Sequence, residues 1–331
     1  MDTPGQPLLV RQAAVVYNPV KVNLDRLRAS VAAAEATAGW HESLWFATSP
    51  EDSGRGAALL AIERGASMVL VAGGDGTVRA AAEALRGTRV ALAIVPSGTG
   101  NLLARNLRLP LSSFDEATAI AFTGVDKPID VGVASVRTDD GVTVDHIFLV
   151  MTGLGLDAQM IANTRPDLKR KVGWLAYVDA VARVLPTVKP FGIRYSLNGR
   201  PHRPAHVSMI LIANCGLLPG NLQFLPEARI DDGILDIAVL QPKGLFGWLA
   251  IWRRVTWENG VLRRSAAGRR IIERTESNRE RVMTTLRGAD IRIVAEQPQD
   301  FEIDGESLGP VRSVHLRADP ASLIVRLPAG S

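Results

Sequence analysis

Cysteine is nearly absent from this chain of 331 residues, and its one cysteine, Cys215, excludes an internal disulfide framework. A chain without disulfides fits a reducing compartment. Cys215 ends the apolar run MILIANC, which favours a small buried thiol over a nucleophile. Lysine is also scarce, because 32 of the 38 basic residues are arginine, and the formal net charge is only +4.

A long apolar run is absent as well. No stretch approaches the ~20 residues that a helix needs to cross a bilayer, and the N-terminal sequence MDTPGQPLLVRQ lacks the basic region and apolar core of a signal peptide. We therefore expect a cytoplasmic protein that can lie peripherally at the inner face of the membrane, and no nucleic-acid partner. With 47% hydrophobic and 22% charged residues, the composition is globular, and the length suits two domains.

The first 130 residues alternate between strand and helix patterns. Asn23 is placed to cap a helix from Leu24 to about Ala38, with Gly39 as its stop. Ser49-Pro50 predicts the start of a second helix, which ends near Arg64. Strands separated by helical crossovers indicate a parallel sheet that is covered on both faces and binds ligands beyond the carboxyl ends of its strands. The other expected elements are strands at Ala13–Tyr17, Leu44–Ala47, Met68–Ala72 and Val90–Val95 and a helix at Val78–Arg86.

After Gly124 the pattern changes to many short strands with few helices, which predicts a β-sandwich or barrel-like second domain. The linker near Phe122–Pro128 is short, so we expect the two domains to enclose a cleft. Helical patterns interrupt the strands at Asp167–Leu185 and Leu245–Glu273. The expected strands are Ile129–Val136, His146–Val150, Gly192–Leu197, Val207–Ile212, Ile234–Leu240, Asp290–Val294, Asp300–Ile303 and Val311–Leu316.

Two glycine-rich turns follow predicted strands and precede predicted helices. They are GGDGT at Gly73–Thr77 and PSGTGN at Pro96–Asn101. Backbone N–H groups in such turns point at an anion, and the following helix end adds positive partial charge. The carboxylate of Asp75 in the first turn can help to bind a polyphosphate only if it holds a cation. The two turns together therefore suggest magnesium–nucleotide chemistry. Neither turn fits the GxGxxG or the P-loop spacing, and the P-loop lysine is missing.

Five motifs in order and spacing resemble those of the diacylglycerol kinase catalytic family, the bacterial lipid kinases related to sphingosine and ceramide kinases. They are Asn18-Pro19, the two glycine turns, DDGILD at Asp231–Asp236 and Asp304-Gly305-Glu306. The resemblance covers nearly the whole chain. It implies an α/β nucleotide-binding domain with an NAD kinase-like parallel sheet at residues 1–128, to which residues 314–331 return. A mainly antiparallel β-sandwich domain follows at residues 129–313.

The resemblance also implies the roles of individual residues. Glu306 takes the place of the proton acceptor for the attacking hydroxyl group. Asp75 would hold Mg-ATP, directly or through water, which supplies the charge neutralisation that phosphoryl transfer needs. ATP and Mg²⁺ are the expected cofactors. The expected nucleotide-binding residues are Asn18, Lys21, Thr48, Gly73, Gly74, Asp75, Gly76, Thr77, Gly98 and Thr99.

Two motifs have a second interpretation. In the family, the positions of the Arg229 carbonyl, the Asp232 carboxylate and the Ile234 carbonyl hold a second, structural Mg²⁺, and oxygen ligands suit that cation. A plain Asp-Gly turn explains the same residues. Asp304-Gly305 is likewise a hairpin signal, and a hairpin turn could also carry the base Glu306.

The chain departs from the family pattern at two places. Arg79-Ala80 replaces the amide and carboxylate that often follow GGDGT, and Val20-Lys21-Val22 replaces a serine- and glycine-containing loop after Asn18-Pro19. Lys21 could supply a point charge to a phosphate. Solvated surface charges are the alternative for both Arg79 and Lys21.

Two segments are candidates for lipid contact. The segment LKRKVGWLAY (Leu168–Tyr177) has three consecutive cations before Trp174 and Tyr177, and cations near a membrane surface attract anionic headgroups. Leu245–Val255 places Trp248 and Trp252 on one helical face, which suits an interfacial helix. An amphipathic helix that packs on the sandwich is the favoured interpretation of the second segment.

The leading hypothesis is an ATP-dependent lipid kinase that acts on a hydroxyl group of a diacylglycerol-like or sphingoid lipid at the interdomain cleft. The expected partners are ATP and a lipid presented at a membrane surface, and whether the chain forms a homodimer is left open. An NAD kinase-like enzyme shares the GGDG turn, but PSGTGN and the terminal Asp-Gly-Glu favour the lipid kinase. A non-catalytic lipid- or nucleotide-binding regulator is the third hypothesis, and Arg79-Ala80 is its only support.

Overall fold

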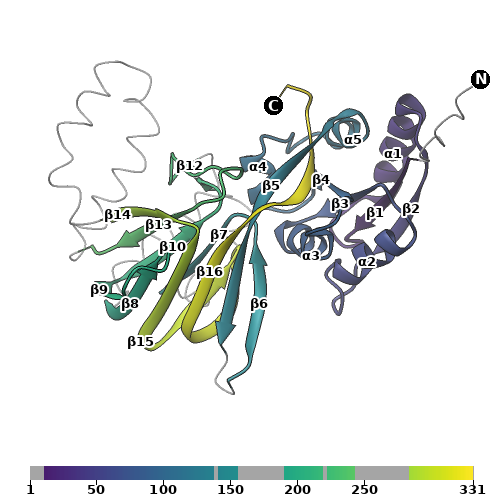
Figure 1. Ribbon diagram of the computed structural model, residues 1–331. Helices are drawn as coiled ribbons and strands as arrows, with labels where there is room; N and C mark the ends of the chain where they lie inside the picture. The colour runs from purple at the N-terminus through teal and green to yellow at the C-terminus, as the bar shows by residue number, and fades with distance from the viewer. Residues whose placement is uncertain (1–10, 138–140, 156–189, 219–221, 243–282, 331) are drawn as a thin grey trace, which may run out of the picture. The chain divides into compact units, whose positions relative to one another are not determined.

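The computed structural model describes residues 11–137, 141–155, 190–218, 222–242 and 283–330 (Figure 1). These residues form two compact units. The α/β unit contains the described chain up to Ile129 and the stretch from Ser322 onward, and the β-rich unit runs from Asp130 to Ala321. The chain therefore contributes to the α/β unit twice.

The α/β unit is built on a parallel sheet with the strand order β2-β1-β3-β4. Strands β3 and β4 are buried along their whole length, as unbroken apolar runs predict for strands covered on both faces. The end of β16 adds a parallel neighbour to β4, with Val325 opposite Leu92. The bounds are β1 (Gln12–Tyr17), β2 (His41–Ala47), β3 (Met68–Gly73), β4 (Ala91–Pro96) and β16 (Glu306–Leu327).

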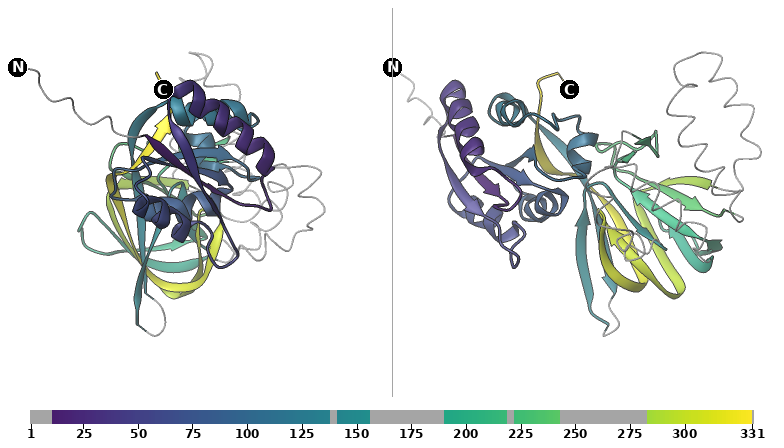
Figure 2. Two further views of the ribbon diagram at one scale, coloured as in Figure 1. Left: turned by 90° about the vertical axis from the view of Figure 1, so that its right-hand side faces the viewer. Right: turned by 180° about the vertical axis from the view of Figure 1, so that it is seen from behind.

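Helices lie on both faces of this sheet (Figure 2). Helices α1 and α5 pack against one face through Leu27, Val31 and Phe122, and α2 and α3 pack against each other and contact strands of the same sheet. The predicted α/β class with a parallel sheet is thereby confirmed. The bounds are α1 (Leu24–Ala38), α2 (Arg55–Glu63), α3 (Asp75–Leu85), α4 (Leu102–Asn106) and α5 (Phe114–Thr123).

Helix α1 begins and ends as predicted. The Asn23 side chain accepts a hydrogen bond of 3.0 Å from the Arg26 amide, and Gly39 closes the helix at φ +69°, a left-handed conformation that glycine adopts without strain. Helix α3 begins at Asp75 rather than at Val78, so the prediction placed its start three residues too late.

The predicted start of α2 at Ser49-Pro50 is wrong. The helix begins at Arg55, because the Asp52 carboxylate accepts hydrogen bonds from the amides of Gly54, Gly56 and Ala57 at 3.0, 3.0 and 2.9 Å. Burial raises the pKa of Asp52, but these backbone bonds outweigh it and hold the pKa below its ordinary value. A carboxylate that reaches several N–H groups is a stronger cap than a hydroxyl group.

The β-rich unit is formed by antiparallel pairs. One series of paired strands runs β14-β13-β10-β7. Two further antiparallel pairs are β8 with β9 and β5 with β6. Strand β15 pairs with β8 near its start, with β7 near its end and with β16 along its length. The bounds are β5 (Val125–Arg137), β6 (Thr143–Phe148), β7 (Met151–Leu154), β8 (Phe191–Leu197), β9 (Arg203–Val207), β10 (Met209–Ala213), β13 (Leu235–Leu240), β14 (Met283–Gly288) and β15 (Asp290–Ile303). The short pair β11 (Leu217–Leu218) and β12 (Leu222–Gln223) stands apart.

A large core cluster of this unit consists of aliphatic and phenylalanine side chains from several of these strands, among them Phe148, Ile237 and Phe301. Two strand predictions need correction. The run Val207–Ile212 is divided between β9 and β10, and the strands expected at Asp290–Val294 and Asp300–Ile303 are one strand, β15. Cys215 is buried, and burial raises the pKa of its thiol, as expected for an unreactive cysteine.

None of the helices that the structure describes is long and apolar enough to cross a membrane. The segments Asp167–Leu185 and Leu245–Glu273, for which helices were predicted, lie outside the described residues.

Candidate active site

The carboxyl ends of β1 to β4 meet at one edge of the parallel sheet (Figure 1). Tyr17 stands opposite both Ala47 and Ala72, and Gly73 stands opposite Pro96. The residues that follow these strands are therefore neighbours, although more than seventy positions separate the first from the last. They include the predicted nucleotide-binding residues Asn18 and Thr48 and the two glycine turns.

The two glycine turns, residues 73–77 and 97–101, touch each other through their backbones and are called the paired turns below. The Ser97 amide donates to the Gly73 carbonyl at 2.9 Å. A Cβ atom added to Gly98 would lie 2.7 Å from the Gly74 Cα atom, and no real side chain tolerates that distance. This close approach requires glycine at position 98.

Asp75 links the paired turns. It is the first residue of α3, and its Oδ1 atom accepts a hydrogen bond of 2.5 Å from the amide of Leu102, the first residue of α4. Its Oδ2 atom lies over Gly100, where a Cβ would come within 2.7 Å. Burial raises the pKa of the Asp75 carboxyl, while the amides of Leu102 and Asn101 and the charge of Lys21 oppose the rise.

Asn101 closes the second turn, although sequence reasoning did not count it among the site residues. Its Oδ1 atom accepts from the Gly98 amide and its Nδ2 atom donates to the Gly98 carbonyl, both at 2.9 Å. Asn101 has φ +47°, a left-handed conformation that asparagine tolerates better than most residues. That tolerance is the signal in PSGTGN by which Asn101 could have been found.

Lys21 reaches the first turn from the loop after β1. Asn18 shapes this loop, because its Oδ1 atom accepts from the Val20 amide at 3.0 Å and its carbonyl accepts from the Lys21 amide at 3.1 Å. The Lys21 Nζ atom would lie 3.1 Å from a Cβ at Gly74. The ammonium group therefore stands beside the paired turns, in a chain that lacks the P-loop lysine.

The three threonines of the predicted site differ in exposure. Thr48 and Thr77 are buried. Thr77 fills the space against Gly73, since a Cβ atom added to Gly73 would lie 2.8 Å from the Cβ atom of Thr77. Thr99 is exposed. The Thr48 amide donates to the Tyr17 carbonyl at 2.9 Å, which fixes Thr48 at the strand edge. Arg79 and Ala80 lie half-buried on α3.

Glu306 follows a two-residue hairpin turn, as the Asp-Gly signal predicts. Asp304 and Gly305 have φ +47° and +83°, and Ile303 pairs with Glu306 across the turn. The Asp304 carboxylate accepts hydrogen bonds from three consecutive amides, residues 149–151, at 2.8, 2.9 and 2.9 Å. Asp304 thus fixes the hairpin tip, and Glu306 stands exposed beside it.

The loop before β13, residues 229–234, contains the positions predicted for a second Mg²⁺. Asp232 accepts from the Ile234 amide through Oδ1 at 3.1 Å and from Arg287 through Oδ2 at 2.5 Å. The Arg229 side chain pairs with Asp231 at 3.2 Å. Among the described residues there is no group of three or more histidine, cysteine, aspartate or glutamate side chains that could hold a metal ion.

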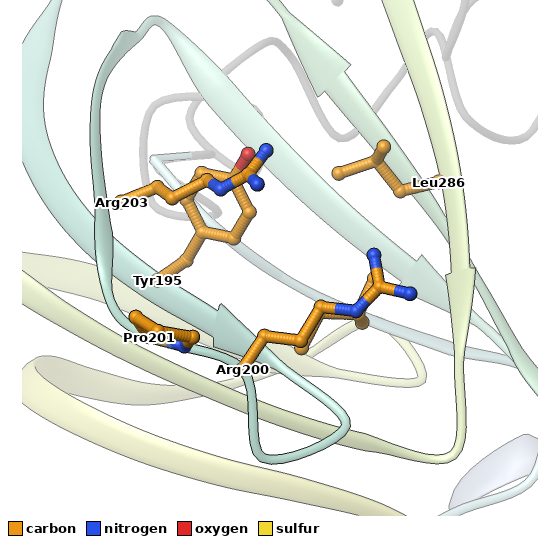
Figure 3. Close-up of a pocket in the computed structure, with 6 residues that line it drawn as sticks. Tyr195, Arg200, Pro201, Arg203 and Leu286 are labelled. Atoms are coloured by element: carbon orange, nitrogen blue, oxygen red, sulfur yellow. The ribbon is translucent and has the colours of Figure 1, made fainter.

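A small cavity of about 80 Å³ lies in the β-rich unit and contains none of the predicted site residues. Arg203 stands opposite Tyr195 in the β8–β9 hairpin, and Leu286 faces them from β14 (Figure 3). The lining of the cavity is completed by Leu197, Arg200 and Pro201. The predicted lipid-contact segments Leu168–Tyr177 and Leu245–Val255 lie outside the described residues.

Two family models match the chain. Residues 12–134 match the model described as the diacylglycerol kinase catalytic domain, and this match contains both paired turns. Residues 149–259 match the model described as the YegS C-terminal NAD kinase beta sandwich-like domain, which includes the loop 229–234.

Individual proteins are similar over most of the chain. The protein named "Probable lipid kinase YegS-like" from Pseudomonas putida is 31% identical over 277 residues, which cover 82% of this chain and 80% of that protein. The diacylglycerol kinase of Mycobacterium tuberculosis is 32% identical over 182 residues, 55% of this chain and 57% of that protein. The solved structure of a diacylglycerol kinase from Bacillus anthracis has a TM-score of 0.69 at 18% identity, covers 98% of this chain and 99% of that chain, and shows a shared fold.

Proposed function

We propose that the chain is an ATP-dependent lipid kinase. It belongs to the diacylglycerol kinase family, because it is 31% identical to a YegS-like lipid kinase over 82% of its length. The γ-phosphoryl group of ATP passes to a hydroxyl group of a diacylglycerol-like or sphingoid lipid. The observation that carries the proposal is the backbone contact between the paired turns at the edge of the parallel sheet.

The paired turns fit a polyphosphate. Because Gly74 and Gly98 carry no side chains, a phosphate group can approach the backbone N–H groups that follow β3 and β4. The Lys21 ammonium group adds a positive charge beside Gly74. Asn18, Thr48, Gly73, Gly76, Thr77 and Thr99 complete the proposed nucleotide-binding set.

Asp75 has two roles in this proposal. One carboxylate oxygen holds the start of α4 through the Leu102 amide, which keeps the second turn in place. The carboxylate also carries the negative charge that can hold the magnesium ion of Mg-ATP, directly or through water. Bound Mg-ATP would supply the phosphoryl group, and its magnesium ion would neutralise the charge that develops on that group during transfer.

Glu306 is the proposed proton acceptor. A hydroxyl group that attacks phosphorus must lose its proton, and an exposed carboxylate on a fixed hairpin can accept it. Asp304 is a positioning residue in this scheme, because its three backbone hydrogen bonds determine where the hairpin tip and Glu306 lie. Since the substrate is a lipid, we propose that the enzyme acts peripherally at a membrane surface.

The test is an assay with labelled ATP in mixed micelles that contain diacylglycerol, ceramide, a sphingoid base or no lipid, with NAD in a separate reaction. Products are identified by mass. We expect a phosphorylated lipid from the wild type and a loss of turnover of about 10²–10⁴-fold in Glu306→Gln, with an unchanged KM for ATP. Phosphorylation of NAD without any lipid product would overturn the proposal.

Glu296→Gln is the matched control, because Glu296 is an exposed glutamate on β15, the strand that leads into the hairpin. This variant is expected to keep wild-type turnover. Equal activity of Glu306→Gln and Glu296→Gln would remove Glu306 from the mechanism.

A further inference from the structure

An arginine lies where the resemblance to lipid kinases implies a structural cation. The loop 229–234 offers the Asp232 carboxylate and backbone carbonyls, and Asp236 follows on β13. Arg287 on the neighbouring strand β14 stands directly opposite Asp236 in the antiparallel register. Side chains at opposite positions share a face of the sheet, so Arg287 and Asp236 project together toward the side chain of Asp232.

One guanidinium group bridges both carboxylates. The Nη2 atom of Arg287 donates to Asp232 Oδ2 at 2.5 Å, and its Nε atom donates to Asp236 Oδ1 at 3.1 Å. Asp236 is nearly inaccessible to solvent, with 6% of its side chain exposed, while 38% of the Arg287 side chain is exposed. The planar fork of arginine suits such simultaneous contacts.

The loop keeps its shape through bonds that involve no ion. Asp130 is buried, and its carboxylate accepts from the amides of Gly233 at 2.6 Å and Ala321 at 2.8 Å. The Ile234 amide donates to the remaining oxygen of Asp232. Each carboxylate of the DDGILD motif is therefore paired with an arginine of the same chain, since Asp231 pairs with Arg229.

We propose that the Arg287 guanidinium takes the place of the divalent cation at this loop, so that the folded chain holds no structural Mg²⁺ there. Magnesium requires an octahedron of oxygen ligands at about 2.0–2.1 Å. The guanidinium group already binds one oxygen of Asp232, the carboxylate that the resemblance assigns to the ion, and one oxygen of the neighbouring Asp236. A second cation beside the first would also meet electrostatic repulsion. The residues at this loop do not fit a magnesium ion.

Removal of the guanidinium group should convert the loop into a cation site. Asp236 Oδ2 is buried and has no hydrogen-bond partner among the described residues. Without Arg287, the carboxylates of Asp232 and Asp236 would form an uncompensated acidic pair with three oxygens left without a partner. A magnesium ion could then replace the lost positive charge.

The experiment uses the full-length protein without nucleotide and measures the melting temperature in EDTA and in millimolar Mg²⁺, together with magnesium content by elemental analysis. For the wild type we expect no bound magnesium and the same Tm in both buffers. A stoichiometric, EDTA-removable magnesium ion that raises the wild-type Tm would overturn the proposal. This readout is independent of kinase activity, so it does not depend on the proposed function.

Arg287→Ala is expected to lower the Tm in EDTA by roughly 3–6 °C and to recover most of this loss in Mg²⁺. If the variant folds only in the presence of Mg²⁺, that result supports the proposal as well. The double variant Arg287→Ala/Asp232→Asn should lose the recovery, which assigns it to this loop. Arg292→Ala is the matched control, because Arg292 is an exposed arginine whose contact with Asp290 is 3.9 Å long.

The variants can also refute the idea. A Tm of Arg287→Ala equal to that of the wild type in EDTA, or a loss of Tm without any recovery in Mg²⁺, would show that Arg287 does not substitute for a cation. Recovery of Arg292→Ala by Mg²⁺ to the same extent would show a general effect of the ion and would also overturn the assignment.

Discussion

At the scale of single residues, Asp75 combines a proposed catalytic role with a cost in stability. Its carboxylate is held inside the paired turns, and burial raises its pKa. A raised pKa means that the folded state binds the proton more tightly than the unfolded chain, whose aspartates titrate near about 3.9. The contribution of Asp75 to stability is therefore greatest below that pH and is lost as the pH rises through the raised pKa.

Asp75→Asn should separate stability from activity. Asparagine keeps an oxygen that can accept from the Leu102 amide and removes the buried charge. At about pH 7 we expect the free energy of unfolding of this variant to be at least equal to that of the wild type. This advantage in stability should shrink as the pH approaches about 4. The variant should show no kinase turnover. Urea unfolding across this pH range and the lipid kinase assay measure both effects.

Asp25→Asn is the control for the removal of one carboxylate, since Asp25 is exposed in the first turn of α1, and this variant should not exceed the wild type in stability at about pH 7. An Asp75→Asn protein that is less stable than the wild type at neutral pH by more than about 1 kcal/mol would show that the hydrogen bonds of the charged carboxylate outweigh its burial.

The sequence indicates which side chains are candidates for the chemistry, but it does not indicate their hydrogen-bond partners. Asp75 and Glu306 stand in short motifs whose residue types indicate the chemistry. The partner of Asp75 is a backbone amide 27 positions away, and an amide has no signature in the sequence. Arg287 is 55 positions from Asp232, and only the β13–β14 register brings the two together.

At the scale of elements, the paired turns depend on the absence of a side chain at Gly98. Gly98→Ala would place a Cβ 2.7 Å from Gly74 Cα, so one of the two backbones must move. We expect a loss of about 1–3 kcal/mol in stability and a rise in the KM for ATP of about tenfold, which corresponds to ~1.4 kcal/mol of binding free energy. Thermal unfolding and steady-state kinetics measure the two effects.

Gly76→Ala is the matched control for stability. A Cβ at Gly76 would meet nothing within 4 Å, and the residue lies in the first turn of α3 without a left-handed φ. Alanine there should leave the Tm unchanged or raise it, because alanine favours a helix over glycine by about 0.8–1.0 kcal/mol. Equal Tm values for the two variants would mean that the contact between the turns does not constrain the backbone.

The bounds of an element could be predicted where residues adjacent in the sequence determine them. Asn23 and Gly39 bracket α1 because both ends depend on residues adjacent to the helix. The start of α2 was missed because Asp52 competes with Ser49 for the cap position, and the sequence shows both residues without their geometry. The run Val207–Ile212 reads as one strand, yet β9 pairs with β8 and β10 pairs with β7 and β13. A continuous apolar pattern contains no sign of such a change of partner.

At the scale of the whole molecule, the fold class was predictable because strand and helix periods change near Gly124 and because the motifs extend along the chain in order. The pairing of Val325 with Leu92 joins the end of the chain to the sheet of the α/β unit. Apolar strands alone do not indicate this pairing, since any parallel edge would accept a strand of that composition.

The two units should contribute separately to ligand binding and to catalysis. All proposed nucleotide-binding residues lie in the α/β unit, whereas Glu306 lies in the β-rich unit. We therefore expect a non-hydrolysable ATP analogue with Mg²⁺ to stabilise the wild type and Glu306→Gln equally, by about 2.7 kcal/mol at a hundredfold excess over Kd. Gly98→Ala should show a smaller shift at the same concentration. Thermal unfolding with and without the analogue measures these shifts. A base that acts only on the lipid hydroxyl group adds nothing to nucleotide binding. A smaller shift in Glu306→Gln than in the wild type would therefore contradict the separate roles of the two units.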